Sequence, residues 1–202
     1  MTATLAARQD GRIGPNAVIR IAEALDAESR SGLARTVFRT ARIEEHLAAP
    51  PDGMVPEDEV ARLMAALFVE LGPEAARRVA REAGRRTADY LIANRIPAPA
   101  RAAFRILPKP IAARLLARSV ARHAWTFAGS GRLVLQPGPP LVFEIRNGPL
   151  CRYLRTDAPA CDYYVGTFER LFGRLVDRRA RALEIACAAA GADACRFKVD
   201  IG

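Results

Sequence analysis

The sequence predicts an α+β fold in which a helix-rich first part is followed by an antiparallel sheet. Apolar residues recur at helical spacing up to about residue 122, and short β-branched or aromatic segments separated by Gly and Pro follow. The chain has 202 residues, half of them hydrophobic, which suffices for a full core. We expect a flexible tail over residues 1–13 and one α+β domain over 14–202, helical over 14–122 and sheet-rich over 123–202.

Turn residues delimit the helices that we expect in the first part. Pro15 suits the first turn of a helix, and apolar residues follow it at helical spacing. The segments Pro50–Gly53 and Gly72–Pro73 are strong turn signals that end later helices. The expected helices cover 15–29, 33–48, 56–71, 74–95 and 111–124, with short helical pieces among the prolines between 97 and 110.

The texture of the sequence changes after His123. The segments HAWTFAG, RLVLQ and PLVFEIR read as strands, because they are short and rich in β-branched or aromatic residues. A helix over 161–178 then carries its aromatic and leucine residues on one face. The segments 181–190 and 194–201 read as a hairpin of two strands around Gly191.

The charge of the chain is basic and comes almost entirely from arginine. Lys and Arg number 31 against 22 Asp and Glu, which gives a formal net charge of +9, and only two of the 31 are lysines. The arginines are spread along the chain with acids among them, so we do not expect nucleic acid as a partner. No apolar run is long enough for a transmembrane segment, and the first residues lack a secretory core. We therefore expect a cytoplasmic protein whose cysteines are reduced.

Two of the four cysteines, Cys187 and Cys195, lie symmetrically around Gly191. If the hairpin pairs in that register, they face each other with Cβ atoms about 5 Å apart. Alternation then places Leu183 and Ile185 on the same, core-facing side. Buried free thiols of the core are one interpretation. A disulfide is geometrically possible, although a reducing cytosol disfavours it.

A closed metal site is the sharper interpretation of the same residues. Cys161, Glu184, Cys187 and Cys195 supply three thiolates and one carboxylate, which suit tetrahedral zinc. A regular strand would point Glu184 and Cys187, three residues apart, to opposite faces. The site therefore requires a β-bulge or an irregular strand end that turns one side chain. From the residues alone, core thiols and a zinc site both remain open.

The segment from Asn147 to Ile201 resembles the 4-vinyl-reductase-type family of small-molecule-binding domains. Cys161 stands before a helix that contains Gly166 and Leu171, and the pattern E-x-x-C-x-x-x-G-x-x-x-C-R-F follows from Glu184. The opening RIGPNAVIRIAEAL is similar to a branch of the family that serves bacteriochlorophyll biosynthesis in purple bacteria. That branch is labelled a vinyl reductase.

The resemblance implies a fold, a metal and a ligand class. It implies a twisted antiparallel sheet covered by helices, as in vesicle-tethering TRAPP subunits, and a homodimer. Members in phenol-sensing activators hold zinc with a pattern that matches Cys161, Glu184, Cys187 and Cys195, which favours structural zinc here. Cys151 lies outside the pattern, and its role stays open. The family binds flat or aromatic small molecules between helices and sheet.

The reductase label has no visible support in cofactor motifs. Reduction of a vinyl group needs a hydride source, and cofactors carry that chemistry. The GSG at 129–131 lacks the following helix of a Gly-rich phosphate loop, and three of the four cysteines fit the zinc pattern better than an iron–sulfur cluster. We therefore expect a carrier that holds a magnesium-porphyrin or chlorophyllide-type intermediate for pathway enzymes. The alternatives are an 8-vinyl (4-vinyl) reductase of divinyl protochlorophyllide and a scaffold subunit.

Residues around the end of the helical part are candidates for the tetrapyrrole site. A tetrapyrrole needs an apolar and aromatic slot, its propionates suit arginine forks, and His123 is a candidate axial ligand of magnesium. Core packing or solvated surface remains the alternative for each. Besides the cytoplasm, the periphery of the photosynthetic membrane is an expected location. The candidates are Phe104, Arg105, Leu107, Leu115, Arg118, Arg122, His123, Trp125, Phe127 and Tyr153.

Overall fold

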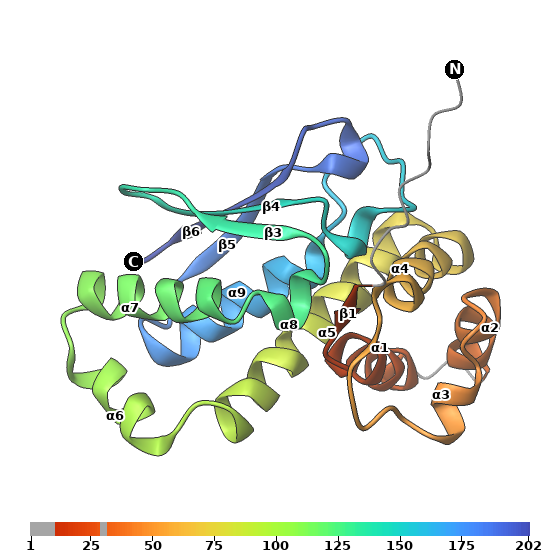
Figure 1. Ribbon diagram of the computed structural model, residues 1–202, viewed down its shortest axis with the longest axis horizontal. Coiled ribbons are helices and arrows are strands. Elements are labelled where there is room, and N and C mark those ends of the chain that lie inside the picture. Colours follow the sequence, from red (N-terminus) through yellow and green to blue (C-terminus); the bar gives the residue numbers. More distant parts are fainter. Residues whose placement is uncertain (1–10, 29–31) are drawn as a thin grey trace.

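The computed structural model describes residues 11–28 and 32–202 and confirms the predicted α+β class. Helices fill the first part, and a sheet packed on helix α9 forms much of the rest (Figure 1). Among the described residues, no helix is long and apolar enough to cross a membrane. The α-helices are α1 (Asn16–Ala27), α2 (Leu33–Thr40), α3 (Glu45–Ala48), α4 (Glu57–Leu71), α5 (Pro73–Asn94), α6 (Ala98–Ile106), α7 (Lys109–Arg122), α8 (Trp125–Ala128) and α9 (Asp162–Leu175).

The main sheet has four strands, β3 (Arg132–Leu135), β4 (Leu141–Arg146), β5 (Arg181–Ala186) and β6 (Cys195–Asp200). Their order is β3-β4-β6-β5, and every neighbouring pair is antiparallel. One face packs on α9, where Phe143 of β4 stacks on Phe168 with ring centroids 4.6 Å apart. Phe197 of β6 meets Phe168 edge-on at 5.6 Å. These buried aromatics hold the helix against the sheet.

Helices α5 and α9 cross at a close approach of their backbones. A Cβ atom on Gly84 would lie 2.1 Å from the carbonyl oxygen of Tyr163, and one on Gly166 would lie 2.2 Å from that of Arg81. Only glycine allows this contact, because any larger residue would drive the helices apart. Helix α1 packs on α5 in turn.

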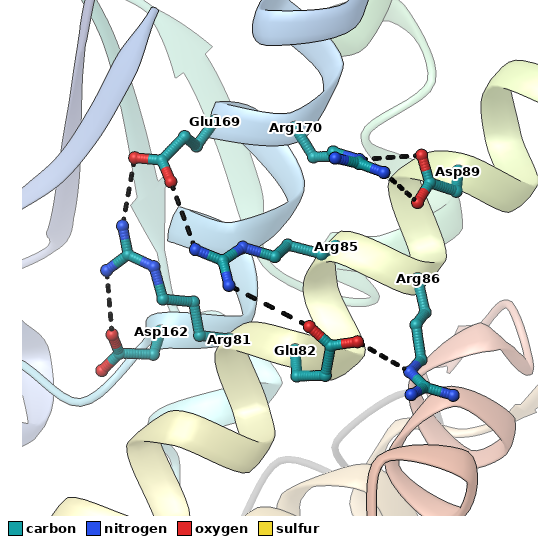
Figure 2. Close-up of polar contacts among 8 residues, drawn as sticks. All are labelled: Arg81, Glu82, Arg85, Arg86, Asp89, Asp162, Glu169 and Arg170. Atoms are coloured by element: carbon teal, nitrogen blue, oxygen red, sulfur yellow. Dashed lines mark hydrogen bonds and ion pairs between the residues drawn. The ribbon is translucent and has the colours of Figure 1, made fainter. Parts of the chain in front are cut away.

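Ion pairs join the same two helices beside the crossing (Figure 2). Arg81 of α5 lies 3.1 Å from Glu169 and 3.6 Å from Asp162 of α9. Arg170 of α9 makes two contacts of 2.9 Å with the carboxylate of Asp89. A polar hollow opens along this side, and these charges already pair with one another across it. The network therefore fixes how α5 and α9 sit together, and it does not form a free binding site.

A buried carboxylate ties the start of the described chain to the sheet region. β1 (Arg12–Ile13) pairs with β2 (Val55–Pro56), and Glu57 follows β2 directly. The Glu57 carboxylate accepts hydrogen bonds from Ser130 N–H at 2.7 Å and Ser130 O–H at 2.6 Å, and it pairs with Arg152 at 2.6 Å. Burial raises its pKa, but the bonds from Ser130 and Arg152 outweigh burial and lower the pKa below its usual value.

Two sequence predictions are corrected here. The predicted strand over 123–129 is wrong, because Trp125–Ala128 form the short helix α8. Ala124 and His123 carbonyls accept the N–H groups of the next turn, and no neighbouring strand reaches the segment, so its β-favouring residues do not decide its structure. The predicted helix over 33–48 is two helices, α2 and α3, because Arg42 adopts a left-handed φ of 59° between them.

The predicted flexible tail over 1–13 lies mostly outside the described residues. Its last two residues do not fit the prediction, since Arg12 and Ile13 form β1 and Ile13 is buried. The hydrophobic side chain of Ile13 and the β1–β2 ladder hold this end in place. The remaining expected helices lie where the sequence places them, each shifted by one to three residues at its ends.

Candidate functional site

The four residues of the predicted metal set come together from three parts of the fold. Cys161 stands immediately before α9, Glu184 lies in β5, Cys187 follows β5, and Cys195 is the first residue of β6. One sulfur or carboxylate oxygen from each lies within 4.8 Å of the others. All four residues are buried. The hairpin supplies three donors and the helix start supplies the fourth.

The hairpin brings its donors together through the irregularity that the sequence analysis required. The register between β5 and β6 shifts between Glu184 and Ala186. This bulge turns Glu184 and Cys187 to the same, inner side. The predicted register is wrong in one respect: Leu183 and Ile185 are exposed by 62% and 50%, because alternation counted back from Cys187 does not survive the bulge.

The spacing of the donors fits a tetrahedral metal. The sulfurs of Cys161 and Cys195 lie 3.6 Å apart, and two thiolates on one zinc lie about 3.8 Å apart when Zn–S is about 2.3 Å. Glu184 Oε2 accepts the N–H of Cys161 at 2.8 Å, whereas its Oε1 is buried without a hydrogen-bond partner. A buried carboxylate oxygen without a partner is costly, and a metal ion would satisfy it.

The charge of the set also calls for a cation. Burial, followed by the nearby Cys187 sulfur, raises the pKa of the Glu184 carboxyl to about 8. Neighbouring sulfurs and burial raise the pKa of the Cys161 thiol well above its usual value. Three thiolates and a carboxylate cannot all be charged in so small a buried volume without a positive ion. The residues present therefore fit a closed structural zinc site, in which protein atoms fill all four positions.

Cys151 lies beside this set and is not part of it. It belongs to the short 3₁₀ helix η1 (Pro149–Cys151), is buried, and places its sulfur 3.5 Å from that of Cys195. A thiolate that binds a metal only accepts hydrogen bonds, so the Cys151 S–H donates to Cys195 when Cys195 is a ligand. The Ala188 N–H reaches the same sulfur at 3.3 Å.

A separate cavity of about 600 Å³ lies between the helices. Its walls come from α1, α5, α7, α8 and α9, and most of its surface is apolar. Volumes of roughly 300–1,000 Å³ with a few polar groups are typical of small-molecule sites. The aromatic residues that line it are Tyr90, Trp125, Phe127, Tyr163, Tyr164 and Phe168.

His123 lines this cavity with one ring nitrogen fixed. Its Nδ1 lies 2.8 Å from the carbonyl oxygen of Ser119. A carbonyl only accepts, so Nδ1 carries the proton in the neutral ring and Nε2 keeps its lone pair. This is the arrangement that a histidine ligand of a metal needs.

Hydrogen bonds hold the two tyrosines of α9 at the cavity wall. Tyr163 O–H and Thr87 Oγ1 are 2.7 Å apart, and Tyr164 O–H donates to the Phe127 carbonyl at 2.9 Å. Burial raises the pKa of both phenols above the usual value. Both rings therefore stay neutral and act as rigid, flat walls.

The structure separates the predicted tetrapyrrole residues into two groups. His123, Trp125 and Phe127 line the cavity together. The others do not line it: Tyr153 donates to Asp58, Phe104 packs on the core from α6, Arg105, Leu115, Arg118 and Arg122 lie on the exposed sides of α6 and α7, and Leu107 follows α6. Sequence reasoning missed Tyr90 and Arg95, which face the cavity from the end of α5, because nothing in an amphipathic helix marks which residues border a void.

Known proteins share this sequence and fold. The family model of the 4-vinyl-reductase domain matches residues 141–201, which contain the hairpin and α9. The bacteriochlorophyll synthase 23 kDa chain of Cereibacter sphaeroides is 43% identical over 188 residues, covering 93% of this chain and 90% of the relative. The chain belongs to the family of the bacteriochlorophyll synthase 23 kDa chain.

A second member of this family and a solved structure extend the comparison. The bacteriochlorophyll synthase 23 kDa chain of Rhodobacter capsulatus is 41% identical, covering 92% of this chain and 85% of the relative. An unliganded Fe(II) H-NOX protein mutant from K. algicida has a TM-score of 0.62 at 10% identity and covers 93% of this chain and 96% of that one. The H-NOX likeness shows that the two proteins share a fold.

Proposed function

We propose that this protein takes part in bacteriochlorophyll biosynthesis by binding a magnesium-porphyrin or chlorophyllide-type intermediate and presenting it to pathway enzymes. The family supports the pathway, since its members are named for bacteriochlorophyll synthase. The cavity supports the ligand class, because flat aromatic walls, an apolar lining and His123 Nε2 suit a magnesium tetrapyrrole. The fixed tautomer of His123 is the observation that carries the proposal.

The chain's own residues would have separate tasks in such a carrier. His123 would offer a lone pair to the ring metal, and Tyr164 and Phe127 would pack against the macrocycle. Arg95 at the cavity rim suits a propionate, which guanidinium binds with two parallel hydrogen bonds. None of these groups supplies a hydride, which is why we favour binding over vinyl reduction.

Absorption spectroscopy with a divinyl chlorophyllide precursor tests the function. We expect the Soret band to shift when the protein is added and no ethyl product to form, with or without a nicotinamide reductant. Ethyl product formed by this chain alone would establish the reductase and overturn the carrier. The absence of any spectral change would leave a scaffold role.

The histidines provide a matched pair of variants for the same experiment. His123→Ala should weaken binding by roughly tenfold or more, because an axial contact worth at least about 1.4 kcal/mol is lost. His46→Ala is the control, since His46 is the other histidine of the chain and pairs with Glu59 at 2.9 Å, away from the cavity. Equal binding by both variants would remove His123 from the site.

We also propose that Cys161, Glu184, Cys187 and Cys195 hold one structural zinc ion, and that the protein forms a homodimer. Zinc would cross-link α9 to the β5–β6 hairpin and contribute to folding. Metal analysis of protein purified without added metal should find about one zinc per chain. Cys187→Ser should lose it, whereas Cys151→Ser should keep it. Sedimentation velocity of the same samples checks the dimer.

A further inference from the structure

One segment of the chain carries nearly all of its net charge. Between Asp89 and Glu144 there is no acidic residue, although the whole chain has 22. Eight basic residues lie in that interval, against a formal net charge of +9. An average over the chain hides this concentration. The eight are Arg95, Arg101, Arg105, Lys109, Arg114, Arg118, Arg122 and Arg132.

The segment contains α6 and α7, which lie at one end of the molecule, away from α1 to α4 (Figure 1). Ile111, Leu115, Arg118 and Arg122 follow one another at spacings of four, three and four, so they share one face of α7. That face is exposed, and the opposite face buries alanines and Leu116 against the protein. The outer face of α7 therefore mixes large apolar side chains with arginines.

Apolar exposure extends beyond α7 to both of its ends. Ile106, at the end of α6, is 83% exposed, and Trp125, in α8, is 62% exposed. On α7 itself, Ile111 and Leu115 are 49% and 43% exposed. Large apolar residues gathered on one surface mark a site of interaction rather than ordinary scatter. We call these four residues together with Arg114, Arg118 and Arg122 the α7 face.

The arginines of the α7 face have no acidic partner among residues 11–28 and 32–202. Elsewhere the protein pairs its charges, as with Lys109 and Asp177 at the base of the same helix. Arg101 donates to the carbonyl of Ile92 at 2.6 Å. No ion pair in the described part of the chain involves Arg114, Arg118 or Arg122. Their charges are available to an anionic partner.

We propose that the α7 face docks on an anionic lipid bilayer. A helix that alternates large apolar residues with arginines suits the interfacial plane, where apolar side chains enter the acyl boundary and guanidinium groups meet lipid phosphates. Tryptophan is favoured at that depth. Each basic residue near an anionic surface adds to the attraction. An acidic protein would satisfy the arginines but would leave Ile106 and Ile111 without a reason to be exposed.

The position of the α7 face has a consequence that rests on the proposed function. Leu116, Val120 and His123, at the inner side and end of α7, line the cavity, and Trp125 belongs to both surfaces. A bilayer on the α7 face would therefore lie against the edge of the cavity. A hydrophobic tetrapyrrole could then pass between membrane and protein without crossing open water.

Vesicle binding without any tetrapyrrole tests the docking independently of the proposed function. The probes are vesicles of phosphatidylcholine alone and vesicles with a third of phosphatidylglycerol. We expect the protein to float with the anionic vesicles only, and less so at high salt. Trp125 is the only tryptophan of the chain, so its emission should shift to the blue on binding and report contact at this face.

Two pairs of matched variants separate the α7 face from net charge and from general apolarity. Arg114→Glu with Arg118→Glu should lower binding at least about tenfold, whereas Arg174→Glu with Arg178→Glu, the same charge change at other exposed positions, should not. Ile111→Ser with Leu115→Ser should abolish the blue shift, and Val69→Ser with Leu183→Ser should keep it.

Three results would overturn the proposal. Absence of flotation with anionic vesicles would exclude the bilayer and leave an acidic protein as partner. Equal loss with both arginine pairs would reduce the effect to net charge. Flotation without a change in Trp125 emission would place the contact on another surface.

Discussion

At the scale of single residues, Glu57 is a buried charge whose partners are all in place. Ser130 and Arg152 meet its carboxylate, and a Cβ on Gly129 would lie 2.1 Å from its Oε2. The site accepts no larger neighbour and no missing charge. Glu57 thereby joins α4, the loop before β3 and the 3₁₀ region into one unit.

Replacing Glu57 should therefore destabilise the protein strongly. Glu57→Gln leaves the Arg152 guanidinium partly buried without its carboxylate, and we expect a loss of about 3 kcal/mol in the free energy of unfolding. Chemical denaturation measures it. Glu45→Gln is the control, because Glu45 is exposed, and it should change stability by less than about 0.5 kcal/mol. A loss at Glu57 no larger than the control's would show that Arg152 finds water instead.

Single residues also show how far the sequence reaches. The spacing of Cys161, Glu184, Cys187 and Cys195 is sufficient to nominate the set that the structure brings together, and even to require the bulge in β5. The cavity could not be predicted in the same way. Arg118 and Leu116 are two residues apart on one helix, and only the tertiary packing decides which of them faces inward.

At the scale of elements, the crossing of α5 and α9 depends on glycine, and α9 offers its own control. Gly166→Ala would press a methyl group against the Arg81 carbonyl, and we expect it to destabilise the protein by roughly 1–3 kcal/mol. Gly173, on the same helix, has nothing within 4 Å of the position that a Cβ atom would take. Gly173→Ala should be neutral or stabilise by up to about 1 kcal/mol.

Thermal unfolding of the two alanine variants compares them directly. Their difference should be large, because one substitution adds overlap and the other removes only backbone freedom. If both variants unfold at the same temperature, α5 and α9 can separate slightly without loss, and the close approach is not a structural requirement.

The limits of prediction differ from element to element. The helices with a clear apolar stripe lie within a few residues of the bounds that the sequence predicts. The failures lie where local preference and context oppose each other. Trp125, Thr126 and Phe127 favour strands, yet they continue from the end of α7 and have no strand beside them. Arg42 breaks a helix through a backbone angle that its side chain does not announce.

At the scale of the whole molecule, paired carboxylates make stability depend on pH. Hydrogen bonds from Ser130 and Arg152 outweigh burial to lower the pKa of Glu57, and bonds from Lys109 and Arg179 lower that of Asp177. A carboxyl whose pKa is lower in the folded state stabilises the protein above its unfolded value of about 4 and loses that contribution as pH falls.

We therefore expect the melting temperature to be steady near neutral pH and to fall steeply below about pH 4.5. Differential scanning calorimetry from neutral to acidic pH measures the slope. In Glu57→Gln the slope should be shallower, because one of the contributing carboxylates is gone. An unchanged slope would assign the acid sensitivity to other groups.

The metal set and the cavity share one helix. Cys161 stands at the start of α9, and Tyr163, Tyr164 and Phe168 of the same helix line the cavity. Removing metal with a chelator should therefore weaken tetrapyrrole binding, and bound tetrapyrrole should slow metal loss by the same free energy. Titration of apo and zinc-loaded protein measures the coupling. Equal affinities would show that α9 keeps its place without metal.

The position of these residues in the chain also sets an order of events during synthesis. Helices α1, α5 and α7 leave the ribosome before α9, but the cavity lacks a wall until α9 packs, and α9 is anchored by donors that come as late as Cys195. A growing or truncated chain would hold at most a partial pocket. Readiness to receive cargo thus becomes a signal that translation has finished, and an incomplete chain could not withdraw a phototoxic pigment from its pathway.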